Sequence, residues 1–158
     1  MSSAPDASAD SVVTGRAPAV ATRKRPKPGE RRVQILQVLA EMLQQPGAER
    51  VTTAALAARL AVSEAALYRH FASKAQMFEA LIDFIESSVF GLINQIGERE
   101  PAGRARAARI VAMVLQFGEK NPGMARVMVG DALVFEHERL QQRMNQFFDK
   151  LDAALRQS

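Results

Sequence analysis

The sequence predicts an all-α protein, and three observations support this fold class. Apolar residues recur at intervals of three and four residues along most of the chain after residue 30, which is the periodicity of amphipathic helices. Good helix-capping residues, namely Thr52, Ser63 and Ser73, stand at the starts of these periodic segments, and Pro and Gly interrupt them. Hairpin signals, alternating strand patterns and internal repeats are absent from the sequence.

The periodic segments predict a series of helices along the chain. The first carries its apolar residues from Ile35 to Leu43 and stops at "QPG". Short helices then follow at about 52–60 and 63–71, and a long one starts after Ser73, with Gln76 placed for a capping box, and ends near 99. The next helix is expected over about 102–119, and Asn121 is expected to cap a segment that begins with Pro122. A final helical pattern runs from Leu133 to Leu155. The fifth helix is expected to be buried through Ile110, Val111, Val114, Leu115 and Phe117.

Composition indicates how the chain is organised into regions and which classes of protein it can belong to. The 158 residues suffice for a small module and a modest second lobe. Residues 1–28 are rich in Ala, Ser, Asp and Pro, so we expect a disordered basic arm there, a DNA-binding domain over 29–75 and a helical lobe over 76–158.

The absence of cysteine excludes a thiolate metal site. With neither a secretory signal nor an apolar run long enough to span a membrane, a cytoplasmic location is expected.

The positive charge is unevenly distributed. The net charge is +4, and residues 1–32 alone carry seven Lys or Arg against three Asp or Glu. Residues 50–74 carry four basic residues against one acidic residue. Such a distribution suits a polyanionic partner. For the N-terminal arm, a solubilising tail is an equally good explanation.

Two short helices joined by a tight turn, over residues 52–71, form the pattern of a helix-turn-helix. In such a motif the second helix enters the major groove, and Ala65 and Ala66 are small enough to let its backbone approach the bases. Hydroxyls and N–H groups at helix starts suit phosphate oxygens, as does a nearby cation. The candidate DNA contacts from this reasoning are Thr52, Thr53, Ser63, Ala65, Ala66, Tyr68, His70 and Lys74.

The two polar aromatic residues each allow a second interpretation. Tyr68, the only tyrosine of the chain, could pack its ring against the first helix and expose only its hydroxyl. His70 could be an exposed residue without a role. Their position together with cations in a helix-turn-helix pattern favours DNA contacts, of the kind that hold phosphates rather than read bases.

The stretch "TTAALAARLAVSEAALYRHFASKAQMFEALIDFI" resembles the DNA-binding domain of the TetR family of bacterial regulators. Ala61 stands where that family often has glycine in the turn. The resemblance implies the same contact positions, and it adds Glu64 and Arg69 on the second helix of the motif. It also implies that Arg31 and Arg32, just before the first helix, reach the DNA backbone or minor groove.

Further along, "QFGEKNPG" and "ALVFEHERLQQRMNQFFDKLDAALRQ" resemble the lobe of TetR-like proteins that act in nucleoid occlusion. This resemblance implies dispersed chromosomal binding sites, a nucleoid-associated location and a second partner, the C-terminal tail of the division protein FtsZ. Phe84, Lys120 and Asn121 match the implied FtsZ-binding surface. Phe84 also falls off the apolar stripe of its helix, so it is expected either as an exposed anchor or as a residue packed on a neighbouring helix.

The resemblance also implies a homodimer, formed in the family by two C-terminal helices that follow the last helix of this chain. Dimerisation of this shorter chain is therefore an open question. No enzyme motif is found, since "HERLQ" lacks the second His of a zinc-protease helix, and neither a metal nor a cofactor is expected. The acidic pairs Asp83/Glu86 and Glu136/Glu138 are interpreted as solvated faces. The alternative function is a ligand-responsive repressor, which the aliphatic lobe with few polar interior residues disfavours.

Overall fold

The structure is a computed structural model that describes residues 27–45 and 50–158. The predicted basic arm therefore lies almost wholly outside the described residues, as does most of the "QPG" turn. Within the described part, all regular structure is helical, as predicted. In order along the chain, the helices are α1 (Pro28–Gln44), α2 (Thr53–Leu60), α3 (Glu64–His70), α4 (Lys74–Arg99), α5 (Arg104–Lys120), α6 (Pro122–Met128), the short 3-10 helix η1 (Asp131–Leu133) and α7 (Glu138–Arg156).

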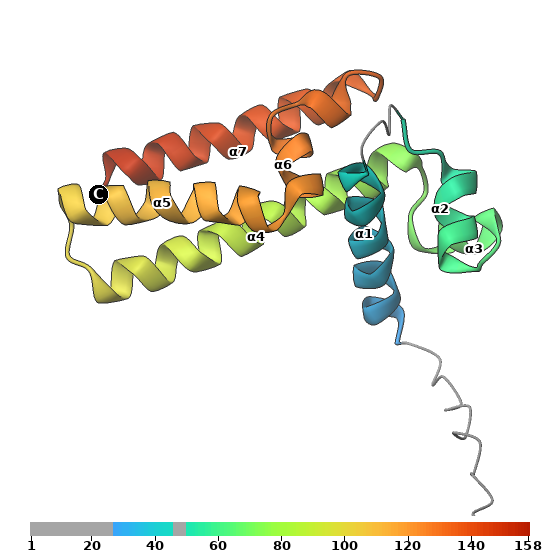
Figure 1. Cartoon of the computed structure of the whole chain (residues 1–158), viewed down its shortest axis with the longest axis horizontal. Coiled ribbons are helices and arrows are strands. Elements are labelled where there is room, and N and C mark those ends of the chain that lie inside the picture. Colours follow the sequence, from blue (N-terminus) through green and yellow to red (C-terminus); the bar gives the residue numbers. More distant parts are fainter. Residues whose placement is uncertain (1–26, 46–49) are drawn as a thin grey trace, which may run out of the picture.

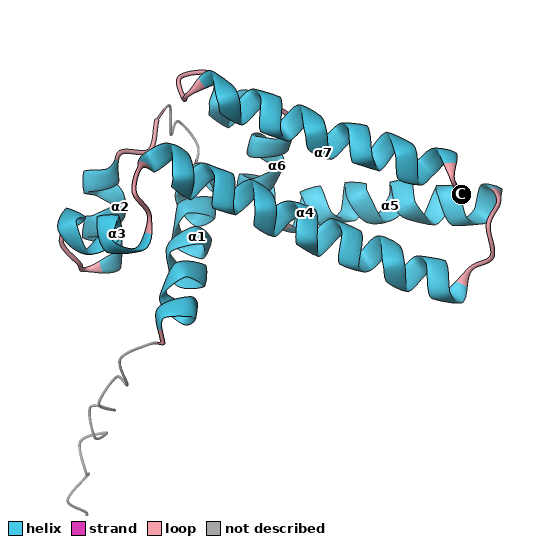
Figure 2. Ribbon diagram, turned by 180° about the vertical axis from the view of Figure 1, so that it is seen from behind, coloured by secondary structure: helices cyan, strands magenta, loops and turns pink. Residues whose placement is uncertain are grey.

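The helices form a small head and an elongated lobe (Figure 1). The head consists of α1, α2 and α3, and α1 contacts both of the others. In the lobe α4, α5 and α7 run roughly along the long axis of the molecule, and the C-terminus lies at the end away from the head. Seen from behind, short α6 lies between α1 and α7 (Figure 2), and it packs against α1 and α5.

One continuous hydrophobic core joins head and lobe. All the α-helices of the described part contribute to it, and its most buried side chains include Ile35, Leu56, Leu67, Phe78 and Phe147. The stripe that predicted α4 is buried as expected from Met77 to Ile93. Because α4 supplies core residues along this whole stripe, it contributes to the core of the head and of the lobe alike.

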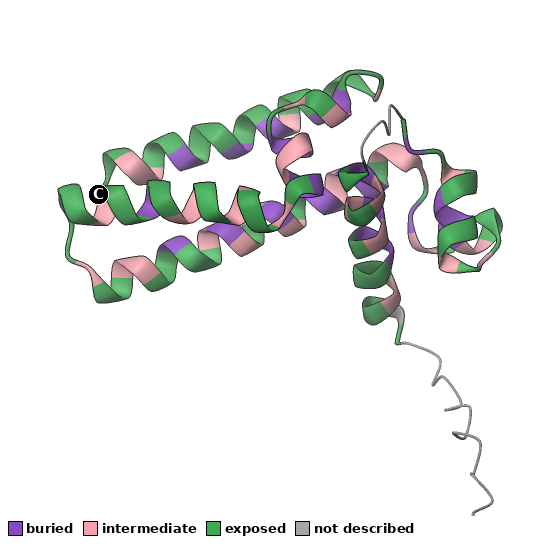
Figure 3. Ribbon diagram, in the orientation of Figure 1, coloured by how far each residue is buried: buried purple, intermediate pink, exposed green. Residues whose placement is uncertain are grey.

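The prediction for α5 was partly wrong. Only Ile110 of this helix is fully buried, whereas Leu115 is 65% exposed and Val111 is also exposed. Burial is confined to the faces that the helices turn toward one another, and the outer sides of α5 and α7 are largely exposed (Figure 3). Among the described residues, no helix combines the length and the low polarity that crossing a bilayer requires.

Close approach of α1 and α6 depends on one glycine. A Cβ atom added at Gly123 would lie 1.9 Å from the carbonyl oxygen of Ala40, which is far inside the contact distance of these atoms. Arg126, one turn further along α6, donates a hydrogen bond of 2.7 Å to the carbonyl oxygen of Leu43 near the end of α1. Thus α6 fixes the C-terminal half of α1 by steric fit and by a cation at the negative end of the helix dipole.

Candidate nucleic-acid interface

Both helices of the helix-turn-helix begin with capping interactions that the sequence predicted. The Thr52 hydroxyl accepts a hydrogen bond from the N–H of Ala55 at 3.1 Å, and the Ser63 hydroxyl accepts one from the N–H of Ala66 at 3.2 Å. Ala61 ends α2 in the left-handed conformation, with a φ of 55°. Glycine adopts this conformation without strain, which explains why the TetR pattern often has glycine here.

The cap that begins α4 differs slightly from the predicted capping box. The Ser73 hydroxyl accepts from the N–H of Gln76 at 3.2 Å, as expected. The Gln76 side chain accepts its hydrogen bond from Ala72 at 2.9 Å, one residue before Ser73. The result is a tight connection in which only three residues separate the end of α3 from the start of α4.

The two faces of α3 have different environments. Leu67 and the following Phe71 are buried, with exposed fractions of 1% and 2%, and they anchor the helix to the head. The Tyr68 side chain is 45% exposed. Ser63, Glu64, Ala65 and Arg69 are also exposed, and Ala66 and His70 are half-buried. By helical spacing, Glu64, Ala65, Tyr68 and Arg69 share one accessible face of α3, whereas Ala66 and His70 lie toward the side of the buried Leu67.

Thr52 and Thr53 lie beside this face at the start of α2. Thr52 is exposed and Thr53 half-buried, and both line a narrow crevice together with Lys74 and Phe78. A capping hydroxyl accepts one hydrogen bond and keeps its own proton as a donor. Thr52 and Ser63 can therefore cap their helices and donate to a phosphate oxygen at the same time.

The predicted placement of Arg31 and Arg32 in an arm before the first helix is wrong. Both residues lie within α1, because this helix already begins at Pro28. Arg31 donates to the side chain of Gln34 at 3.0 Å. Arg32 donates to the backbone carbonyl of His70, and its guanidinium lies over the Phe71 ring, 4.3 Å from the centroid. Arg32 thus fixes the C-terminal end of α3.

Lys74 has an intramolecular partner that the sequence did not indicate. Its Nζ lies 2.7 Å from Oε1 of Glu136, and the side chain of Glu136 is only 7% exposed. Arg50 lies 3.7 Å from the same carboxylate oxygen. The interpretation of Glu136 as part of a solvated acidic face is therefore wrong, while its neighbour Glu138 is exposed as expected.

Arg50 is a further candidate that the sequence reasoning missed. Its side chain is 58% exposed, two residues before Thr52, and it adds a cation beside the predicted contacts. The charge excess of residues 50–74 was the available signal, but charge alone does not show which cations share a surface.

The predicted partner surface of the lobe is only partly exposed. Phe84 is half-buried and packs against the core, so the expectation of a fully exposed anchor is corrected in favour of packing. Lys120 is exposed. Asn121 stands before α6 but does not cap it; its side-chain amide instead donates to the carbonyl of Phe117 at 2.9 Å. Lys120 and Asn121 line a groove against Gln37, Glu41 and Gln44 of α1.

The other acidic pair, Asp83/Glu86, is also not simply solvated. Arg143 of α7 donates to both carboxylates, at 2.8 Å to Asp83, and Lys150 lies 2.7 Å from Glu86. Burial acts to raise the pKa of Glu86, but hydrogen bonds from Lys150 and Arg143 and their charges together hold it below its ordinary value. For Arg143, burial acts to lower the pKa, and the two carboxylates outweigh it and raise the pKa. These ion pairs join α4 to α7.

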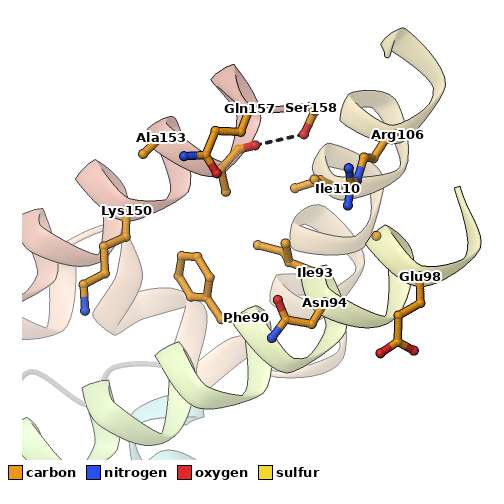
Figure 4. A pocket seen from close by; sticks show the side chains of 12 residues that line it. Phe90, Ile93, Asn94, Glu98, Arg106, Ile110, Lys150, Ala153, Gln157 and Ser158 are labelled. Carbon is orange, nitrogen blue, oxygen red and sulfur yellow. Dashed lines mark hydrogen bonds between the residues drawn. The ribbon is translucent and has the colours of Figure 1, made fainter. Parts of the chain in front are cut away.

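A pocket opens between α4, α5 and α7 at the end of the lobe away from the head (Figure 4). Phe90, Ile93 and Ile110 supply its apolar side. The pocket is also lined by the polar residues Asn94, Glu98, Arg106, Lys150, Gln157 and Ser158. The expectation of few polar residues in the interior of the lobe does not hold for this pocket.

The fold and the arrangement of α2 and α3 define a helix-turn-helix DNA-binding protein. A family model for bacterial regulatory proteins of the tetR family matches residues 35–81, and one for the SlmA-like, tetracyclin repressor-like C-terminal domain matches residues 103–158. The chain belongs to the TetR family of regulators, with a lobe of the SlmA-like type. This family consists of DNA-binding regulators rather than enzymes.

Curated relatives show the same similarity over most of the chain. The nucleoid occlusion factor SlmA of Marinomonas sp. (strain MWYL1) is 54% identical over 131 residues, which is 83% of this chain and 66% of the relative. SlmA of Aliivibrio fischeri (strain MJ11) is 51% identical over 84% of this chain and 68% of its own length. SlmA of Vibrio cholerae serotype O1 is 52% identical over 80% of this chain and 65% of its own length. The chain spans about two thirds of the length of these relatives.

Proposed function

We propose that this protein is a nucleoid occlusion factor, which binds many dispersed chromosomal sites and restrains FtsZ assembly over the nucleoid. The observation that carries the proposal is the extent of the similarity to SlmA. At 51–54% identity it covers more than four fifths of this chain in two of these relatives, and so includes the lobe as well as the head. A similarity limited to the helix-turn-helix would support only DNA binding.

On the DNA side, we propose that α3 lies in the major groove with its exposed face toward the bases. Tyr68, His70 and Lys74 would contact phosphates together with the hydroxyls at the starts of α2 and α3, while Ala65 and Ala66 permit close approach. Glu64 and Arg69 lie at the edges of this face. A homodimer would place two such helices on two half-sites and gain affinity by linking them.

On the partner side, we propose that the C-terminal tail of FtsZ binds along α4 and the α5–α6 corner. Half-buried Phe84 offers an apolar edge there, and Lys120 offers a cation for an acidic residue of the tail. Asn121 is already held by the Phe117 carbonyl, which fixes the shape of the corner. Simultaneous binding of DNA and FtsZ would localise the protein to the nucleoid in the cytoplasm.

Sedimentation of FtsZ polymers with this chain, with and without DNA, tests the proposal. The chain is expected to shorten or disperse polymers more strongly when DNA is bound. Phe84→Ala is expected to reduce FtsZ association and spare DNA binding, whereas Tyr68→Phe is expected to do the reverse. Equal loss of both activities in Phe84→Ala would indicate a folding defect and would argue against a partner surface at this residue.

The pocket between α4, α5 and α7 favours one second candidate, a ligand-responsive repressor. Its apolar side and its cations Arg106 and Lys150 suit an amphipathic anion. A chromosome-wide map of bound sites distinguishes the candidates. Many dispersed sites that avoid the replication terminus support nucleoid occlusion, and one or two sites beside a divergent operon support a local repressor.

A further inference from the structure

We propose that Glu136 of the lobe is a positioning residue, which holds Lys74 in place for a DNA phosphate. The proposal rests on the phosphate contact of Lys74 proposed above. It assigns to the segment between η1 and α7 a part in DNA binding, although this segment lies more than sixty residues after the helix-turn-helix along the sequence.

The geometry places one carboxylate between two cations of the head. Glu136 Oε1 lies 2.7 Å from Lys74 Nζ and 3.7 Å from Arg50 Nε. Lys74 is the first residue of α4, and Arg50 stands just before the start of α2. Glu136 therefore connects the lobe to the starts of two helices that flank the DNA-binding face.

Lys74 is held by more than this ion pair. Its Nζ lies 5.9 Å from the centroid of the Phe78 ring, and its side chain shares a crevice with Thr52 and Thr53. The side chain lies next to the two threonines, and it is 20% exposed, so it is not sealed off from solvent.

An ammonium group has three N–H donors, and Glu136 takes one of them. Other donors remain for a phosphate oxygen. A free lysine side chain loses rotamer entropy when a ligand immobilises it, and this loss lowers affinity. Because Glu136 already restricts Lys74 before DNA arrives, much of that loss is incurred on folding rather than on binding.

The local charge also favours positioning over competition. Two cations face a single carboxylate, so the group as a whole keeps a positive charge toward the DNA. Without Glu136, Lys74 and Arg50 would repel each other and lose their common partner. Glu138, two residues further on, is exposed at the first turn of α7, and none of the described residues is paired with it.

This difference supplies a matched control, because E136Q and E138Q remove the same charge from neighbouring positions. The affinity of each full-length variant is measured by fluorescence anisotropy on a duplex selected by the wild-type chain from a random-sequence library, over a series of salt concentrations. Relative to E138Q, E136Q is expected to bind about tenfold more weakly. The slope of the logarithm of its binding constant against the logarithm of the salt concentration is expected to be smaller, by about the amount that one phosphate contact contributes. A purely structural role would leave this slope unchanged.

The variants K74A and K74A/E136Q complete a double-mutant cycle. E136Q is expected to have little further effect once Lys74 is absent, because it acts through that side chain. If E136Q proves unstable in thermal unfolding, E136D replaces it. The shorter side chain keeps the charge but moves the carboxylate away from Lys74, so E136D is expected to weaken DNA binding less than E136Q does.

Binding by E136Q and E136D that is as tight as in E138Q, with an unchanged slope, would overturn the inference. Tighter binding would also overturn it, because Glu136 would then compete with DNA for Lys74. If K74A itself binds normally, the proposed phosphate contact fails and the inference fails with it. If K74A binds weakly but E136Q does not, only the inference fails.

Discussion

The outward face of α3 and the contacts that hold α1 and α3 in place both contain arginines, and the arginines act differently in the two regions. Tyr68 and Arg69 point away from the head, and no described residue pairs with their polar groups. Arg32 binds the carbonyl of His70 at the end of α3, and Arg126 binds the carbonyl of Leu43 near the end of α1. A positive charge in this sequence is therefore not always a candidate for DNA, because these two arginines make helix-end contacts within the protein.

These two arginine contacts form a series from the lobe to the DNA-binding face. Through Arg126, α6 holds α1, and through Arg32, α1 holds α3. Cations near helix C-termini stabilise the unpaired carbonyls and the negative end of the dipole. The orientation of α3 thus depends on α1 and α6, and changes at these contacts should affect DNA binding without touching DNA.

The largest expected effect comes from Gly123→Ala at the contact of α6 with α1. The new Cβ would overlap the backbone of Ala40, which cannot move as a flexible side chain would, so we expect a loss of about 3 kcal/mol in the free energy of unfolding. Thermal or denaturant unfolding measures this loss.

Gly118→Ala is the matched control, because its Cβ would meet only the Cβ of Ala125 at an ordinary 3.8 Å. Within α5 this change is expected to stabilise the protein by about 0.5–1 kcal/mol. Equal stability of the two variants would show that α1 and α6 are not closely packed in solution.

The second prediction concerns Arg32. Arg32→Lys keeps the charge but removes the planar guanidinium that both stacks on Phe71 and binds the His70 carbonyl. We expect a loss of about 1 kcal/mol in unfolding free energy and weaker DNA binding with an unchanged salt slope. A reduced salt slope at unchanged stability would instead support a direct phosphate contact. Arg31→Lys, one residue away and paired only with Gln34 among the described residues, is the control.

Local patterns predicted much of the head, because its determinants lie close together in sequence. The capping hydroxyls of Thr52, Ser63 and Ser73 each act on a backbone N–H three residues later, so a short stretch contains the whole interaction. The inward face of α3 followed from Leu67 and Phe71 in the same way.

The remainder depends on contacts between distant segments, which no local pattern specifies. Lys74 and Glu136 are 62 residues apart, and Arg126 and Leu43 are 83 apart. The exposure of Leu115 was missed for a related reason: α5 has apolar residues on several sides, and only the positions of its neighbours decide which side is buried.

The third prediction tests the outward face of α3 itself. Tyr68→Phe removes only a hydroxyl from a side chain that is 45% exposed, so the unfolding free energy is expected to change by no more than about 0.5 kcal/mol. DNA affinity is expected to fall by about 1 kcal/mol, to a similar degree on all sequences, because a phosphate contact carries no base information. An anisotropy titration at fixed salt measures it. Unchanged affinity would support the alternative in which the ring only packs.

The smallest effect on DNA binding is expected from a charge inside the lobe, Glu86, away from the arginine series. Its pKa is lowered in the folded protein, so its charged form contributes stability above the pKa of the unfolded chain. This contribution is lost as the pH falls through the folded-state value. The wild type should therefore be more stable than Glu86→Gln at neutral pH, and this difference in unfolding free energy should shrink in acid. DNA binding at neutral pH should be nearly equal in the two proteins.

Unfolding of both proteins along a descending pH series measures the difference in stability. Glu119→Gln, at an exposed position of α5, is the control. A stability difference that is constant with pH would mean that Glu86 stabilises the contact of α4 with α7 by side-chain packing. Its ion pairs with Arg143 and Lys150 would then contribute little.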